Sequence, residues 1–171
     1  MALKPPPASS EAVHNVMVAN RSTDTGPEMV VRRMLREAGQ PGYRLHWRID
    51  DEEGRYVCRP DIAYPGRKLA IFVHGCFWHR CARCALGLPK SNVEYWSEKF
   101  DRNVERDRRK QAALLDGGWL VHTIWECNLE NGANDVIRGE LSTNGEINGQ
   151  EGVEGSRRRA LPQALRPVQP V

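Results

Sequence analysis

The first clear pattern of apolar and polar positions lies in the N-terminal quarter of the chain. Apolar side chains recur at helical spacing over residues 29–35, after the segment Thr25-Gly-Pro-Glu28 and before Gly39. Thr25 can cap a helix, Pro27 fits its first turn and a glycine commonly ends it. The pattern therefore predicts a helix that begins at Thr25 and ends before Gly39.

Three shorter apolar runs predict strands, at residues 56–64, 69–74 and 119–126. The run at 69–74 reads LAIFVH and is almost continuously apolar. Strands that are buried on both faces have this character. We therefore expect residues 69–74 to form a central strand, with the other two strands beside it.

A long helix is predicted over residues 92–116. Ser91 and Glu94 have the spacing of a capping box, and the pair Gly117-Gly118 ends the pattern. One face of this helix carries Trp96, Phe100, Asn103 and Asp107.

The aromatic residues on that face favour contact with the protein interior, so Asp107 is expected to point inward as well. A carboxylate in such a place needs a partner. The sequence leaves two alternatives open, an ion pair with an arginine such as Arg32 or Arg33, or a place at a metal or water site.

The order helix, strand hairpin, long helix, strand predicts an α/β domain with a mixed sheet. We place this domain at residues 15–130. Residues 1–14 contain PPP and are expected to form a flexible arm, whereas residues 131–171 are rich in Gly, Asn, Glu, Pro and Arg and are expected to be a mostly disordered tail. One or two weak helical turns are expected over residues 134–141.

Composition narrows the class of protein. The chain has 171 residues and a net charge of +3, which is compatible with a nucleic-acid partner but does not require one. An apolar run long enough to cross a membrane is missing, and the N-terminal segment lacks the apolar stretch of a secretory signal. A cytoplasmic protein without a membrane partner is therefore expected.

Cysteine spacing indicates a metal site. Cys76, Cys81, Cys84 and Cys127 could supply the four thiolates of a structural zinc site, while the alternative is a set of ordinary buried cysteines. The fifth cysteine, Cys58, could replace Cys127 as a ligand, although a buried position without metal is the better expectation.

The segment that holds these cysteines, HGCFWHRCARC, also carries other reactive residue types. If four thiolates close the zinc site, His74 and His79 are free for proton transfer or phosphate contact. The adjacent Phe77 and Trp78 leave two alternatives open, since one of them could pack in the core or both could project as a wedge that unstacks base pairs.

Asp61, in the segment Arg59-Pro60-Asp61, is the candidate metal-binding carboxylate. A Pro-Asp dipeptide can be a simple turn, but restriction-endonuclease-like nucleases place such an aspartate on one strand and a catalytic segment on the next. Oxygen ligands of this kind suit Mg²⁺. The acid-x-lysine of these nucleases is missing, because Val73 and His74 stand in its place.

Taken together, these segments resemble the very short patch repair (Vsr) DNA mismatch endonucleases. The matches are RSTDTGPEM at 21–29, RPD at 59–61, FVHGCFWH at 72–79, NVERDRR at 103–109 and WEC at 125–127. The resemblance covers about residues 15–130. It implies an α/β fold with a restriction-endonuclease-like mixed sheet flanked by helices, together with a structural zinc site.

The resemblance also implies an activity, which is nicking of double-stranded DNA 5′ to the thymine of T:G mismatches that arise from deamination of 5-methylcytosine. Mg²⁺ would be the catalytic cofactor, and mismatch-repair proteins are candidate partners. Because a mismatch has no two-fold symmetry, a monomer is expected. Two alternatives remain, a nicking endonuclease of the same fold associated with restriction–modification, and a non-catalytic zinc module that binds DNA.

Residue roles follow from the same resemblance. Asp61 and the backbone carbonyl of Val73 would bind Mg²⁺, His79 would activate water, and Glu28 would support His79. The remaining implied roles are a shell around the phosphate and metal-bound water (His74, Asp107), a wedge into DNA (Met17, Phe77, Trp78) and zinc ligation (Cys76, Cys81, Cys84, Cys127). The chain departs from some relatives at Cys81, where they carry histidine, and at Val73, where threonine is common.

Overall fold

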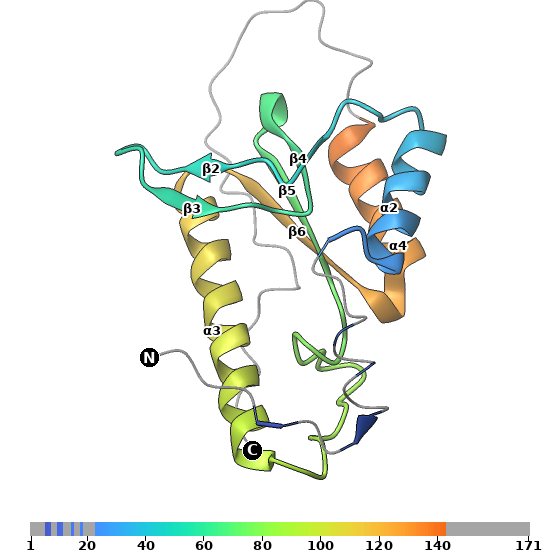
Figure 1. Ribbon diagram of the computed structural model, residues 1–171. Coiled ribbons are helices and arrows are strands. Elements are labelled where there is room, and N and C mark those ends of the chain that lie inside the picture. Colours follow the sequence, from blue (N-terminus) through green and yellow to red (C-terminus); the bar gives the residue numbers. More distant parts are fainter. Residues whose placement is uncertain (1–5, 8–9, 12–14, 16–17, 19–22, 143–171) are drawn as a thin grey trace, which may run out of the picture.

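The computed structural model describes residues 6–7, 10–11, 15, 18 and 23–142 (Figure 1). Met17, most of the expected N-terminal arm and the tail from residue 143 onward lie outside these residues, so the expectations for them stay predictions. None of the helices in the described part has the length and apolar character needed to cross a membrane.

A four-stranded mixed sheet forms the centre of the fold, with the strand order β1-β4-β5-β6. The strands β1, β4 and β5 are joined by antiparallel pairing, whereas β5 and β6 are parallel. Their bounds are β1 Arg44–Leu45, β4 Ile62–Tyr64, β5 Leu69–His74 and β6 Leu120–Trp125. The predicted α/β class with a mixed sheet is therefore confirmed.

Helices cover both faces of this sheet, as Figure 1 shows. On one face, α2 (Gly26–Glu37) and α4 (Leu129–Val136) pack against the odd-numbered residues of β5. On the other face, Ala70 and Phe72 of β5 contact Leu114 of α3 (Val93–Asp116). Because side chains alternate along a strand, His74 shares the α3 face with Ala70 and Phe72.

All six residues of β5 are buried, so the prediction of a central strand at 69–74 is confirmed at both ends. The parallel register pairs His74 of β5 with Trp125 of β6. The segments that follow these two strands therefore leave the sheet at the same edge, and the candidate functional residues gather there.

The predicted strand at 56–64 is wrong as a single element. Tyr56–Cys58 forms β3, which pairs with β2 (Ile49–Asp50) in a separate two-stranded sheet, whereas β4 belongs to the central sheet. Pro60 has no N–H to donate to a strand ladder and restricts the residue before it. The chain changes sheets across 59–61, and this change places Asp61 directly before β4.

The start of α3 also differs from the prediction. Its N-cap is Asn92, which has a left-handed φ of 54° and makes no side-chain capping hydrogen bond. The predicted capping box of Ser91 and Glu94 is therefore wrong. The expected length of the helix is confirmed to within one residue, because it ends at Asp116, before Gly117-Gly118.

Helical structure continues past residue 130. The helix α4 is followed by a π-helical segment, Ile137–Leu141, and Ala133, Val136 and Leu141 are buried in the core beside α2. The structure therefore contains more helix in this segment than the one or two weak turns expected over residues 134–141. This segment is short and poor in strong helix formers, so tertiary packing of its apolar face stabilises it.

Gly132 gives a test of this packing. A Cβ at residue 132 would lie 2.9 Å from Cγ2 of the buried Ile124 on β6, so valine there cannot fit without displacing the side chain of Ile124. We expect Gly132→Val to lower the free energy of unfolding by about 1–3 kcal/mol, as overpacking typically does.

Thermal unfolding followed by circular dichroism measures this effect, at roughly 2–4 °C per kcal/mol for a chain of this size. Gly139→Ala is the matched control, because a Cβ there meets no atom within 4 Å. Equal melting temperatures for the wild type and Gly132→Val would show that α4 does not pack closely on β6.

Candidate active site and metal centre

Asp61 lies directly before β4 and contacts the neighbouring strand β5. Its Oδ2 accepts a hydrogen bond of 2.7 Å from the backbone N–H of Val73. Burial raises the pKa of Asp61, and the hydrogen bond from the Val73 N–H lowers it in part. The nearby carboxylate of Glu28 raises this pKa further. In the described part of the chain, no lysine or arginine forms an ion pair with Asp61.

A partly buried carboxylate that forms no such ion pair fits a divalent metal ion, which would stabilise its ionised form. The predicted Mg²⁺ ligands, Asp61 and the backbone of Val73, are therefore side by side. This donor set of oxygen atoms agrees with the preference of Mg²⁺.

His74, His79 and Asp107 converge from three elements at the same edge of the sheet. His74 ends β5, His79 lies in the following loop, and Asp107 lies midway along α3. Nδ1 of His79 is 2.6 Å from Oδ2 of Asp107, and the two imidazole rings stack with centroids 3.8 Å apart. The prediction that Asp107 points inward is confirmed, and its partner is His79 rather than Arg32 or Arg33.

The charge states of this cluster favour proton acceptance by His79. Burial opposes ionisation of Asp107, but the hydrogen bond with His79 outweighs it and the pKa of Asp107 is lowered. An ionised Asp107 accepts the Nδ1–H of His79, which leaves Nε2 of His79 as the acceptor. A histidine oriented by a carboxylate is a common arrangement for a general base.

Burial lowers the pKa of His74 to about 3, and the neighbouring His79 adds to this effect. The folded protein therefore keeps His74 neutral at pH values where the unfolded chain, with an ordinary pKa of 6.5, takes up a proton. The free energy of unfolding should consequently fall as the pH falls from 6.5 towards 3, by up to about 1.4 kcal/mol per pH unit.

His74→Phe should remove this pH dependence of the free energy of unfolding. Phenylalanine keeps a ring in contact with Trp125 and Phe72, which flank His74. Between pH 6.5 and 5, the wild type should lose about 2 kcal/mol more stability than the variant. Urea unfolding at both pH values measures the difference. Parallel pH profiles for the two proteins would contradict a buried, neutral His74.

Glu28 is buried on α2 and ion-pairs with Arg32, with 2.6 Å between Nη2 and Oε2. The hydroxyl of Thr25 donates a second hydrogen bond to it, at 2.9 Å. The resemblance implied that Glu28 supports His79, but the carboxylate that contacts His79 is Asp107. Glu28 instead lies near enough to Asp61 for its charge to raise the pKa of that residue.

Sequence reasoning missed two residues beside Glu28. Asp24 and His46 bring potential ligand atoms within 4.8 Å of one another and of Glu28, and Arg32 pairs with both carboxylates. His46 adopts a left-handed backbone conformation, with φ of 46°, after β1. Spacing in the sequence gives no signal for this placement, because β1 reaches the site only through its pairing with β4.

The four predicted zinc ligands also meet at this edge of the sheet. The Sγ atoms of Cys76, Cys81, Cys84 and Cys127 all lie within 4.8 Å of one another. Cys76 and Cys127 each follow by two residues the paired His74 and Trp125, so the parallel register of β5 and β6 brings them together.

Cys58 is not part of this cluster. It is fully buried in a second hydrophobic core, on the α3 side of the central sheet, together with Ile49, Phe72 and Leu114. The burial of Cys58 and the clustering of the other four cysteines are therefore confirmed.

The donor chemistry of the cysteine cluster fits zinc, which binds four thiolates in structural sites. Burial disfavours the Cys81 thiolate, but the backbone N–H groups of Cys84 and Arg83 outweigh burial, and the pKa of Cys81 is lowered. Burial raises the pKa of Cys76 to about 12, so a metal ion would have to displace the proton of that thiol, because the thiolate is the form that ligates metal.

Phe77 and Trp78 lie in the loop between the two histidines and are half-buried. The ring of Phe77 contacts Phe100 at 5.1 Å between centroids, and the ring of Trp78 lies 6.0 Å from Trp96. Both rings thus pack against aromatic residues of α3 and keep part of their surface exposed. Their use as a wedge stays a prediction.

Comparison with known proteins identifies the family. A family model described as DNA mismatch endonuclease Vsr matches residues 9–85. The chain is 44% identical over 124 residues to the type II nicking enzyme V.XorIIP of Xanthomonas oryzae pv. oryzae, a match that covers 72% of this chain and 85% of that protein. The chain belongs to the Vsr DNA mismatch endonuclease family.

Two further relatives of this Vsr-family chain are a nicking enzyme and a mismatch endonuclease. It is 39% identical over 120 residues to the type II nicking enzyme V.NmeAIP of Neisseria meningitidis serogroup A, which covers 69% of this chain and 79% of the relative. The match to the DNA mismatch endonuclease Vsr of Escherichia coli K12 is 44% identical over 88 residues, or 52% and 55% of the two chains. The expectation of a DNA-cleaving enzyme is confirmed at the level of the family.

The Vsr-family site also contains basic residues that sequence reasoning did not single out. Nη2 of Arg106 lies 3.5 Å from Oδ1 of Asp107, and the Arg106 side chain is 48% exposed. Burial is the main cause of the low pKa of His74, and the charges of Lys110 and Arg106 add to it. Helix α3 thus brings positive charge to the site, where the acid-x-lysine of related nucleases is missing.

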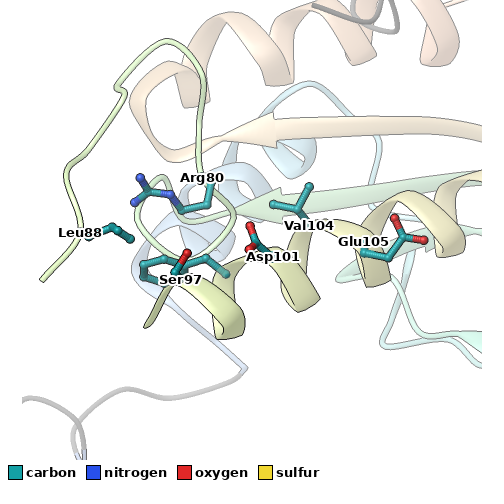
Figure 2. A pocket seen from close by; sticks show the side chains of 7 residues that line it. Arg80, Leu88, Ser97, Asp101, Val104 and Glu105 are labelled. Atoms are coloured by element: carbon teal, nitrogen blue, oxygen red, sulfur yellow. The ribbon is translucent and has the colours of Figure 1, made fainter. Parts of the chain in front are cut away.

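A pocket lies between α3 and the loop that contains Arg80 and Leu88 (Figure 2). None of the residues with predicted catalytic or zinc-binding roles lines it. The lining residues are Arg80, Leu88, Ser97, Phe100, Asp101, Val104 and Glu105. The pocket is therefore separate from the catalytic cluster of this Vsr-family protein.

Proposed function

We propose that this protein is a Mg²⁺-dependent endonuclease that nicks one strand of duplex DNA. The observation that carries the proposal is the pair His79–Asp107 beside Asp61, a partly buried carboxylate that forms no ion pair with any described lysine or arginine. The printed names of the relatives V.XorIIP and V.NmeAIP, type II nicking enzymes, support the same activity. This activity follows the alternative of a nicking endonuclease associated with restriction–modification.

The proposed roles follow from the contacts at the site. Asp61 and the Val73 backbone carbonyl would hold Mg²⁺, which when bound supplies charge to the phosphate and lowers the pKa of water. Nε2 of His79 accepts the proton of the attacking water, while Asp107 holds the ring in position. Neutral His74 stacks on His79 and limits its rotation.

Positive charge for the phosphate comes from α3 in this proposal. Arg106 is half-exposed beside Asp107, and Lys110 is near enough to His74 to influence its pKa. A phosphate diester at the site would meet both cations, which favour the negatively charged backbone of DNA.

Zinc at the cysteine cluster has a structural role in this proposal. Cys76 and Cys81 bracket the loop residues Phe77, Trp78 and His79. A bound zinc ion would therefore fix the segment that carries both the general base and the aromatic pair.

Conversion of supercoiled plasmid tests the nicking activity. We expect the purified protein to convert supercoiled DNA to the open circular form in the presence of Mg²⁺, and to stop when EDTA is added. Accumulation of linear DNA from the start would indicate double-strand cleavage instead. Binding of DNA without any cleavage of plasmid or of a T:G duplex, at any Mg²⁺ concentration, would favour a non-catalytic zinc module.

A T:G mismatch is the second candidate for the substrate. The name of the family and that of the Escherichia coli relative support it, as do Phe77 and Trp78, whose rings are partly exposed. Insertion of a side chain costs a few kcal/mol per base step. A weak T:G pair lowers this cost, which would give preference over matched DNA.

A panel of duplexes that differ in one base pair separates the two candidates. If the mismatch is the substrate, the T:G duplex should be nicked at least ~10-fold faster than the matched C:G duplex, which corresponds to about 1.4 kcal/mol. Equal rates for all duplexes would leave a nicking enzyme of broader specificity. Because a mismatch has no two-fold symmetry, the enzyme is expected to act on it as a monomer.

A further inference from the structure

Besides the cysteines, a second group of metal-ligating side chains lies at the edge of the sheet. His74, His79 and Asp107 each offer one ligand atom, and these atoms all lie within 4.8 Å of one another. The group unites the end of β5, the following loop and α3, so the fold itself brings the residues together.

The donor chemistry of this group differs from that of the predicted Mg²⁺ site. Mg²⁺ prefers oxygen ligands, and Asp61 with the Val73 carbonyl supplies oxygen alone. Two imidazoles and one carboxylate instead suit transition metals such as Zn²⁺, Co²⁺ or Ni²⁺. The two sets of ligands would therefore select different ions.

The two imidazole rings must unstack before they can share such an ion, because an imidazole binds a metal in the plane of its ring and these two planes are nearly parallel. Two tetrahedral ligands at about 2.0–2.1 Å from zinc are roughly 3.3 Å apart. Nδ1 of His79 and Oδ2 of Asp107 are already 2.6 Å apart, and the stacked ring of His74 lies 3.8 Å away between centroids. Because the core holds His74, the change has to come from His79, whose loop follows β5. Binding of the ion therefore requires His79 to turn out of the stack.

The site is also open to an ion from solvent. The side chains of His79 and Asp107 are 22% and 14% exposed, whereas His74 is buried against Trp125 and Phe72. One ligand is therefore held firmly by the core, and the other two face an entry path.

We propose that His74, His79 and Asp107 bind one transition-metal ion of the zinc class and that this ion inhibits nicking. The inhibitory part rests on the proposed function. A metal bound at Nδ1 of His79 would replace the proton that this nitrogen donates to Asp107. Asp107 could then no longer orient the ring for proton transfer. Mg²⁺ at Asp61 would not relieve this inhibition, since it occupies different ligands.

Metal binding is measured on the full-length protein with one equivalent of zinc already bound. Co²⁺ is then titrated and followed by equilibrium dialysis and by its visible absorption. We expect one additional equivalent of Co²⁺, with the spectrum of nitrogen and oxygen ligands and without a thiolate charge-transfer band. Such a band on the additional ion would place it at the cysteines and would overturn the proposal.

Variants locate the additional ion. Asp107→Asn and His74→Ala should each weaken its binding by at least roughly tenfold. His122→Ala is the matched control, because His122 lies on β6 beside Glu140 and is outside the group. Unchanged Co²⁺ binding by both site variants, or no additional equivalent in the wild type, would overturn the proposal.

Inhibition is measured separately, by adding Zn²⁺ to the nicking reaction in the presence of excess Mg²⁺. Loss of nicking in step with occupancy of the additional site, and recovery when a zinc chelator is added, supports the proposal. Full nicking at saturating Zn²⁺ overturns the inhibitory part alone. A protein that binds the additional ion but never nicks DNA overturns the proposed function as well, and the Co²⁺ titration distinguishes these results.

Discussion

Asp61→Asn is expected to abolish nicking while the protein stays folded. Asparagine preserves the volume of the side chain and can still accept the hydrogen bond from the Val73 N–H. It removes the charge that would hold Mg²⁺, so the nicking rate should fall by at least about 10³-fold, or about 4 kcal/mol in the barrier.

The stability of the same variant makes the test specific. Because burial raises the pKa of Asp61, the charged carboxylate destabilises the folded protein at neutral pH. We therefore expect the melting temperature of Asp61→Asn, measured without Mg²⁺, to equal or exceed that of the wild type. A lower melting temperature together with lost activity would mean that Asp61 has a structural role.

Asp101→Asn is a suitable control for this substitution. Asp101 is an exposed aspartate on α3 and lines the pocket outside the catalytic cluster (Figure 2). Its replacement should leave the nicking rate within about twofold of the wild type, since exposed sites away from the chemistry rarely contribute more. Substantial nicking by Asp61→Asn would contradict the assignment of the metal ligand.

Cys81→Ala is expected to remove zinc and destabilise the protein. The Sγ atoms of Cys81 and Cys127 are 3.8 Å apart, so a shared metal joins the loop after β5 to the end of β6. Structural zinc contributes folding free energy directly. The loss should be at least about 3 kcal/mol, or roughly 10 °C in melting temperature.

Metal analysis provides the measurement and Cys58→Ala provides the control. The wild type should contain one equivalent of zinc and Cys81→Ala close to none. Cys58→Ala should retain the zinc and lose only the packing of a small side chain, because Cys58 lies in the second core. Wild-type protein without zinc, or full zinc in Cys81→Ala, would contradict the cysteine assignment.

Much of the fold could be predicted from the sequence where local and tertiary signals agree. The strand at 69–74 is continuously apolar because both of its faces are buried, and the helix after Thr25 has its cap, its proline and its terminal glycine in sequence order. The helix α4 was predicted less well than these two elements. Its stability comes from burial of Ala133 and Val136 against distant elements.

The site was predictable in its residue types but not in its contacts. Helical periodicity indicated that Asp107 points inward, whereas its contact with His79 depends on the loop after β5, for which periodicity gives no rule. Cys127 joins the cysteine cluster through the parallel pairing of β5 and β6. Sequence spacing alone therefore could not decide between Cys127 and Cys58.

The most direct test of the whole account is strand-resolved cleavage of a duplex with one T:G mismatch, labelled on each strand in turn, by wild type and Asp61→Asn. The account predicts a nick in one strand only, and if the mismatch is the substrate, this nick lies in the thymine strand on the 5′ side of the mispaired thymine. It also predicts that this nick requires Mg²⁺ and is lost in the variant. Cleavage of both strands, or equal nicking by Asp61→Asn, would contradict it.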